Sequence, residues 1–135
     1  MAEIHSLNNT DASNTARFNG ASNVSTLDDA GRALEGIIAR NYHDNDGTNT
    51  TTGSNTAYVI ATNRSGITAN SEARTFVIRF HVANNGACTF QVNALTAKPL
   101  RKRGNAALVT GDILQNDINL VVYNPAWDAF QVVGI

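Results

Sequence analysis

Charged residues are scarce in this chain of 135 amino acids. Asp, Glu, Lys and Arg make up 16% of it, against about a quarter in typical globular proteins, and the formal net charge is −1. A chain so close to neutral lacks the positive field that draws a protein to nucleic acid or to an anionic membrane. The composition therefore argues against a nucleic-acid partner. The many Asn and Thr residues indicate a surface of amides and hydroxyls, which suits packed assemblies and exposed fibres.

The chain has a single cysteine, Cys88, and no long hydrophobic run. One cysteine excludes an intrachain disulfide, and its position in an expected strand indicates a small buried side chain and not a reactive thiol. No run approaches the roughly 18 apolar residues of a membrane span. Residues 1–6 lack the basic segment followed by an apolar segment that marks a secretion leader. The sequence thus predicts a soluble protein that does not insert into a membrane.

Motifs for enzyme chemistry are also missing. None of the three histidines is spaced as a metal ligand, either with another histidine or with Cys88, and there is no Walker loop or Gly-x-Ser-x-Gly elbow. The polar run 44–55 lacks the glycine position and the distal Glu of an EF-hand. Asp112 follows a glycine and is interpreted as a turn or capping residue. We therefore expect no catalysis, no cofactor and no bound metal.

Alternating apolar residues predict strands over the C-terminal half. Phe76, Ile78 and Phe80 share one face of an expected strand, and Asn85-Gly86 follows as a tight turn. Such segments recur at short intervals without intervening helices, which favours an antiparallel sandwich or small barrel. The expected fold is mainly β, preceded by an extended N-terminal arm and one short helix. The expected strands are 57–62, 75–82, 88–92, 98–101, 118–123 and 129–133.

A helix is predicted before the strands, at 27–43. Its apolar residues recur at three- and four-residue spacing and form one stripe: Leu27, Ala30, Leu34, Ile37 and Ile38. Gly31 and Gly36 each weaken the helix by roughly 1 kcal/mol relative to Ala, and a helix of about four turns is marginal alone. The stripe must therefore be buried. Two arrangements would bury it: packing on the chain's own β domain, or a bundle of helices from several copies.

The flanking segments are polar. Residues 1–26 have too few large apolar side chains to offset the entropy of ordering, so this arm is expected to be extended unless a partner orders it. Residues 44–55 contain no apolar side chain and are predicted to be a loop or linker. The expected organisation is an arm at 1–26, an oligomerisation helix at 27–43, a linker at 44–56 and a β domain at 57–135.

The β segments resemble a known family. The stretch NNGACTFQVNALTAKPL at 84–100 is followed by GDI at 111–113, VVY at 121–123 and AFQV at 129–132. Together they are similar to a module of bacteriophage tail-fibre and virion appendage proteins. The order of an Asn-rich N-terminus, a short helix, a polar spacer and strands is also similar. These motifs are structural and include no catalytic group.

The resemblance implies an assembly role. It favours a homotrimer in which three helices meet around an axis, and other virion proteins of the tail, baseplate or capsid as partners. The N-terminal arm would dock the chain to the particle through Leu7, Arg17 and Phe18; the alternative is a disordered terminus. The implied location is the virion, assembled in the host cytoplasm.

Two features are candidate ligand contacts. Lys98, Arg101, Lys102 and Arg103 form the densest positive stretch and could contact phosphate, an acidic sugar on a host surface or an acidic patch of a neighbouring subunit. The alternative is a hairpin edge kept soluble by its cations. Trp127 lies at an expected turn, where it could stack on a sugar ring or seal the end of the core.

The function expected from these observations is non-enzymatic. The chain would be a short trimeric fibre or spike of a phage virion, which displays a β domain and could serve attachment to a host-surface glycan. A head fibre or capsid decoration protein without a receptor role, and a stand-alone carbohydrate-binding module, are the alternatives.

Overall fold

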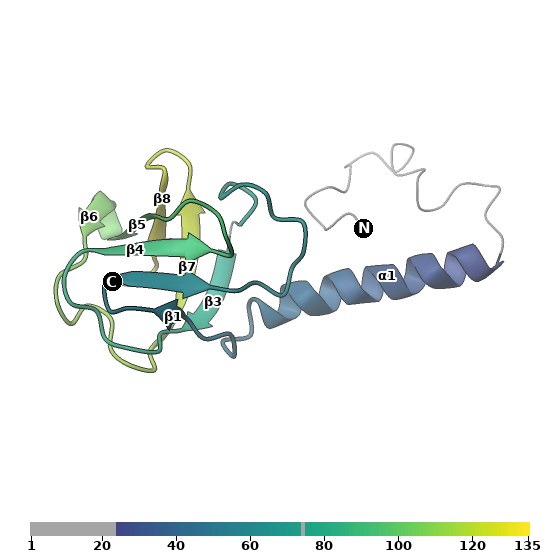
Figure 1. The fold of residues 1–135 in the computed structure, drawn as a ribbon, viewed down its shortest axis with the longest axis horizontal. Coiled ribbons are helices and arrows are strands. Elements are labelled where there is room, and N and C mark those ends of the chain that lie inside the picture. The colour runs from purple at the N-terminus through teal and green to yellow at the C-terminus, as the bar shows by residue number, and fades with distance from the viewer. Residues whose placement is uncertain (1–23, 74) are drawn as a thin grey trace.

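The computed structural model describes residues 24–73 and 75–135, which form a β domain preceded by a long helix (Figure 1). This confirms the mainly β fold with one helix that the sequence predicts. The helix α1 (Val24–His43) begins three residues before its predicted start. The expected arm at 1–26 lies almost wholly outside the described residues. The strands are β1 (Thr52–Gly53), β2 (Ala57–Ile60), β3 (Thr75–Arg79), β4 (Cys88–Val92), β5 (Lys98–Lys102), β6 (Ala106–Ala107), β7 (Ile118–Asn124) and β8 (Ala129–Val132), with a 3₁₀ turn, η3 (Arg103–Asn105), before β6.

The strands of this described part form one curled sheet in the order β1-β2-β4-β5-β8-β7-β3, and β6 pairs with β5 outside this path (Figure 1). Most neighbours are antiparallel, but β2 with β4 and β5 with β8 are parallel. This detail differs from the antiparallel sheet that we expected. Side chains alternate between two faces in either kind of strand, so the alternation in the sequence says nothing about strand direction.

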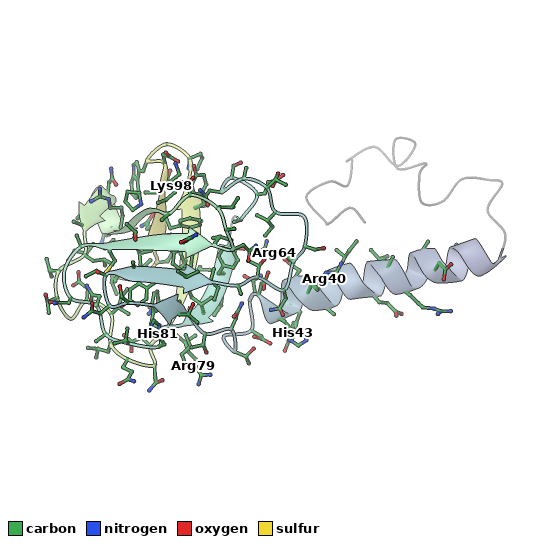
Figure 2. All side chains as sticks on the ribbon, viewed as in Figure 1. Arg40, His43, Arg64, Arg79, His81 and Lys98 are labelled. Carbon is green, nitrogen blue, oxygen red and sulfur yellow. The ribbon has the colours of Figure 1, made fainter. Side chains whose placement is uncertain are left out.

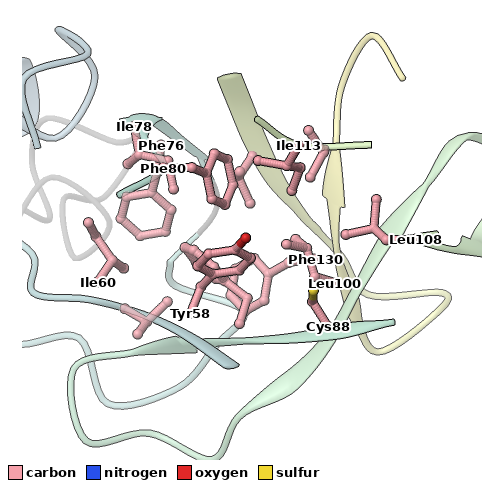
Figure 3. Close-up of a cluster of buried hydrophobic side chains, with 14 of the residues drawn as sticks. Tyr58, Ile60, Phe76, Ile78, Phe80, Cys88, Leu100, Leu108, Ile113 and Phe130 are labelled. Carbon is pink, nitrogen blue, oxygen red and sulfur yellow. The ribbon is translucent and has the colours of Figure 1, made fainter. Parts of the chain in front are cut away.

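The concave face of the sheet encloses the core (Figure 3). Phe76, Ile78 and Phe80 are completely buried, as their alternation predicts, and so are Phe90 and Val92. Aromatic rings make edge-to-face pairs across the core, with ring centroids 4.9 Å apart in both Tyr58–Phe80 and Phe90–Phe130. Each such pair adds about 0.5–1.5 kcal/mol beyond the burial of its apolar area. The core therefore ties β2, β3, β4 and β8 together.

Residues 44–53 connect the two edges of the sheet, so the segment predicted to be a linker is part of the β domain. On one side it bonds with β3: Gly47 N donates to Val77 O at 3.1 Å, and Thr51 N donates to Arg79 O at 2.9 Å. On the other side β1 pairs with β2. Side-chain hydropathy does not reveal this pairing, because it is made by backbone hydrogen bonds.

The turn geometry matches the residues that occupy it. Gly86, in the predicted turn before β4, has φ of +91°, a conformation that Gly adopts without strain.

Cys88 is 5% exposed and packs in the core, as expected. Asp112 accepts a hydrogen bond from Val109 N at 2.7 Å, which confirms its interpretation as a turn residue.

Candidate functional site

The helix α1 leaves the β domain at its C-terminal end and extends away from the sheet (Figure 1). A helix of 20 residues is about 30 Å long. Large apolar side chains on it are exposed: Leu27 by 54%, Leu34 by 38%, Ile38 by 56% and Tyr42 by 65%. At roughly 100° per residue, these four lie on one side of the helix. We call them the apolar stripe.

The structure places the five residues of the predicted helix stripe in two environments. Leu27, Leu34 and Ile38 are exposed, whereas Ala30 is half-buried and Ile37 is fully buried. Ile37 is therefore not available on the surface of the single chain. Tyr42, which the spacing argument left out, extends the apolar stripe by one more turn.

The opposite side of the helix lines a groove of about 660 Å³, which it forms with Ser65 in the loop that follows β2. Five of the lining residues lie on the side of α1 opposite the apolar stripe, and Ser65 belongs to the loop. The residues are Asp29, Arg32, Ala33, Gly36, Arg40 and Ser65. The apolar stripe lies on the other side of α1, and the exposure of its side chains shows that the β domain does not cover it.

Asp44 fixes the end of the helix to the β domain. It is completely buried, and its Oδ1 accepts hydrogen bonds from the backbone N of Asn63 at 2.7 Å and from the side-chain amide at 3.0 Å. Its Oδ2 accepts from Arg64 Nε at 2.7 Å. A buried carboxylate requires such partners, because a buried charge without them is costly. Asp44, Asn63 and Arg64 thus form a rigid junction between helix and sheet (Arg64 is labelled in Figure 2).

The basic stretch lies within the sheet. Strand β5 has β8 on one side and β4 followed by β6 on the other, so it is not the exposed hairpin edge that the alternative interpretation required. Lys98 Nζ donates to Asp128 Oδ2 at 2.6 Å, and Lys102 Nζ donates to Asp112 Oδ2 at 2.8 Å. These ion pairs neutralise half of the predicted basic surface.

The other two cations of this stretch differ from the lysines. Arg101 is half-buried and Arg103 is exposed in the η3 turn. Within the described residues, neither guanidinium has an ion pair or a side-chain hydrogen bond. The four basic residues therefore do not act as one uniform positive patch.

Trp127 lies in the turn between β7 and β8, where its backbone N donates to Asn124 O at 3.2 Å. The side chain is half-buried. It is not part of the core cluster of the described residues, whereas the nearby Tyr123 packs against that core and lies 5.3 Å from Phe130 between ring centroids. Trp127 therefore does not seal the core as the alternative interpretation proposed.

A polar cleft of about 320 Å³ lies beside this turn. Lys98 lines it from β5, near the upper edge of the β domain in Figure 2. Three parts of the chain that are far apart in sequence contribute the lining: the loop before β3, the β4–β5 loop with the start of β5, and the end of β7 with the β7–β8 turn. The residues are Thr68, Ala69, Asn70, Ser71, Leu95, Thr96, Lys98, Tyr123 and Asp128.

Asp128 is the centre of a hydrogen-bonded network in this cleft. Its Oδ2 accepts from Lys98, and its Oδ1 accepts from Tyr123 Oη at 2.7 Å. The hydrogen bonds from Lys98 and Tyr123 lower the pKa of Asp128 below its usual value. The hydrogen bond to Asp128 raises the pKa of the Tyr123 phenol. At neutral pH the network is therefore a carboxylate between an ammonium and a neutral phenol.

Asn70, which also lines the cleft, has one unpaired side-chain atom. Its side-chain Nδ2 donates to Thr96 O at 3.0 Å, which fixes the orientation of the amide because a carbonyl can only accept. Its Oδ1 is inaccessible to solvent and has no hydrogen-bond partner. An unsatisfied buried acceptor is uncommon in proteins and requires an explanation.

The cleft includes one of the predicted ligand residues, Lys98, and excludes Arg101, Lys102, Arg103 and Trp127. Sequence reasoning missed Tyr123, Asp128 and Asn70. Asp128 was recognisable as an acid in a turn, but its neighbours in the cleft come from segments up to 60 residues away. No pattern within one segment of the sequence predicts that these residues lie together.

Other predicted features have no counterpart on this surface or lie beyond it. Leu7, Arg17 and Phe18, the proposed docking residues, are outside the described residues. Across 24–73 and 75–135, no group of three or more His, Cys, Asp and Glu side chains is arranged to hold a metal ion. No helix in the same part of the chain has the length and apolar character to span a membrane.

The chain matches no model of a known protein family, and no curated protein matches its sequence. The function must therefore be inferred from the apolar stripe of the helix and the polar cleft of the β domain.

Proposed function

We propose that this protein is a non-enzymatic structural protein of a phage virion, a short trimeric fibre or spike. The helices of three copies associate, the N-terminal arms attach the trimer to the particle, and the β domains are displayed outward. The observation that carries the proposal is the apolar stripe: four large apolar side chains on a protruding helix, which the chain's own β domain leaves exposed.

The energetics favour association of helices. Burying a large aliphatic or aromatic side chain is worth about 1.5–3 kcal/mol, and a stripe of four such side chains is therefore a strong drive to associate. A protruding helix gains most of its stability from packing of this kind. Parallel copies would bring the stripes together around one axis, as in a short coiled coil. The number three rests on the resemblance of the β segments to phage fibre modules.

The β domain is suited to display. Its core is self-contained, and its junction with the helix is fixed by the buried Asp44. A rigid domain at the end of a helical bundle could contact a host surface, which makes attachment a role for a tail fibre, and it could equally decorate a head or baseplate.

A second candidate is a carbohydrate-binding module that acts outside any virion. The polar cleft with Asn70 and Asp128 favours it, since that site needs no assembly. The apolar stripe would then have no role.

The assembly is tested by light scattering after size-exclusion chromatography of the full chain. We expect three times the 14.4 kDa of one chain at micromolar concentration. A monomer would overturn the fibre proposal.

The virion role is tested with a chain that lacks residues 1–26. This chain should keep its β fold, as measured by circular dichroism, and should no longer be incorporated into particles. Incorporation that survives the deletion would exclude the docking arm.

A further inference from the structure

We propose that the polar cleft binds an uncharged saccharide. The cleft of about 320 Å³ is at the small end of ligand pockets, which are roughly 300–1,000 Å³, so it fits one or two sugar rings. This inference goes beyond assembly and names a site and a ligand class. As a binding site it is independent of the virion proposal; only its use for host attachment rests on that proposal.

The lining has the chemistry that sugar hydroxyls need. Each hydroxyl both donates and accepts hydrogen bonds, and the cleft offers both functions: the hydroxyls of Thr68 and Ser71, the ammonium of Lys98 and the carboxylate of Asp128. Leu95 and the ring of Tyr123 supply an apolar part of the lining for the C–H faces of a sugar. No aromatic slot for a flat hydrophobic ligand is present in this lining.

Asn70 holds the lining of the cleft together. Its Nδ2 donates to Thr96 O at 3.0 Å, so the loop before β3 is tied to the loop before β5. Its Oδ1 is inaccessible to solvent, so the groups that can contact a ligand are those of the other lining residues.

The charge of the cleft also favours a neutral ligand. Lys98 is already paired with Asp128, and the side chain of Asp128 is 61% exposed. Each carboxylate oxygen has two lone pairs, so Asp128 retains acceptor capacity after bonding Lys98 and Tyr123. A sugar hydroxyl can use these lone pairs, whereas an anionic ligand would be repelled by the carboxylate.

The chain contains its own matched control. Lys98–Asp128 and Lys102–Asp112 are two ion pairs from the same strand, β5, and only the first lines the cleft. Asp128→Asn removes the charge at a backbone with φ of +45°, a conformation that Asn tolerates. Asp112→Asn makes the same change at the other pair.

The experiment is isothermal titration calorimetry on the full chain, with saturation-transfer NMR for weak binding. The probes are glucose, galactose, mannose and N-acetylglucosamine, against N-acetylneuraminic acid and inorganic phosphate. We expect at least one neutral sugar to bind with a Kd in the millimolar range or below. Asp128→Asn should weaken this binding by about tenfold or more, as expected for loss of a hydrogen bond to a charged group, and Asp112→Asn by less than about twofold.

Three results would overturn the inference: saturable binding of none of the neutral sugars, binding only of the anionic probes, or equal weakening by both variants. The oligomeric state of the same samples separates this inference from the proposed function. A trimer without sugar binding removes only the saccharide site, and a sugar-binding monomer removes only the fibre.

Discussion

Arg64 Nε lies 2.7 Å from Oδ2 of Asp44, the residue that directly follows helix α1. The same guanidinium donates from Nη2 to Thr75 O at 3.1 Å, and its Cζ lies 4.9 Å from the centroid of the Phe76 ring. One side chain thus contacts the end of the helix, the start of β3 and a ring of the core. The direction in which the helix projects depends on this pair.

Asp44→Ala should destabilise the β domain strongly. The substitution removes the acceptor of hydrogen bonds from Asn63 and Arg64 and leaves the Arg64 charge largely buried, at a cost of about 3–5 kcal/mol. Urea denaturation measures it. Asp46→Ala is the control, since the Asp46 side chain bonds only to its near neighbours Thr48 and His43, and it should destabilise the chain much less than Asp44→Ala does. Similar losses for both variants would contradict the role of the junction.

Leu34→Glu combined with Ile38→Glu should convert the oligomer to monomers. Both side chains lie on the apolar stripe, and three copies would bring these charges together in a low-dielectric interface. Light scattering reports the mass, and circular dichroism checks that the β domain remains folded. Ala39→Glu places the same charge at an exposed position beside the stripe and should leave the oligomer intact. A trimer that survives the double substitution would exclude the stripe as the interface.

Gly53→Ala should destabilise the chain by about 1–3 kcal/mol. The residue has φ of +94°, where L side chains are strained, and an added Cβ would collide with the carbonyl oxygen of Ala57. Gly31→Ala is the control, because an added Cβ there meets no atom of the same chain and Ala is the better helix former by about 1 kcal/mol. Thermal unfolding should therefore shift in opposite directions for the two variants.

Acid should remove the contribution of Asp46 to stability. Hydrogen bonds from the Thr48 hydroxyl and backbone, with a further one from His43, lower the pKa of Asp46 to about 2. A carboxyl with a lowered folded-state pKa stabilises the fold above its unfolded pKa of about 3.9, and loses that effect as the pH falls towards 2. The difference in Tm between the native chain and Asp46→Asn should accordingly shrink from pH 5 to pH 2. A difference that stays constant over this range would contradict the assignment.

Cys88 should react with thiol reagents only when the chain unfolds. It is 5% exposed, and burial raises the pKa of its thiol, so little thiolate is present at neutral pH. Ellman's reagent should modify it slowly in buffer and rapidly in concentrated urea. Fast modification of the folded protein would show that the turn before β4 opens.

The sequence predicted what local patterns encode. Alternation at Phe76, Ile78 and Phe80 identified a buried face, and the spacing of Leu27, Leu34 and Ile38 identified a helix with an apolar side. Both patterns are repeats of the backbone geometry itself, so they can be recognised without knowing what lies nearby.

Long-range relationships were not predictable in this way. The segment 44–53 joins the sheet through backbone atoms, which every residue has, and the cleft joins Asn70 to Asp128 across the fold. The Lys98 side chain was recognised as a candidate contact, but its partner Asp128 lies 30 residues later in the chain. The sequence shows which charged and polar side chains the chain has, but only the fold shows which of them contact each other.

Residues 44–53 cover both edges of the sheet, which limits the contacts that two copies of the chain can make. An uncovered strand edge offers unpaired N–H and C=O groups to any other chain, and it is a common origin of runaway cross-β aggregation. Here the backbone of β3 and that of β2 are already engaged by the same chain. Crowded neighbours can therefore touch through side chains while their backbones stay separate, which allows many copies to be held close together without merging into amyloid.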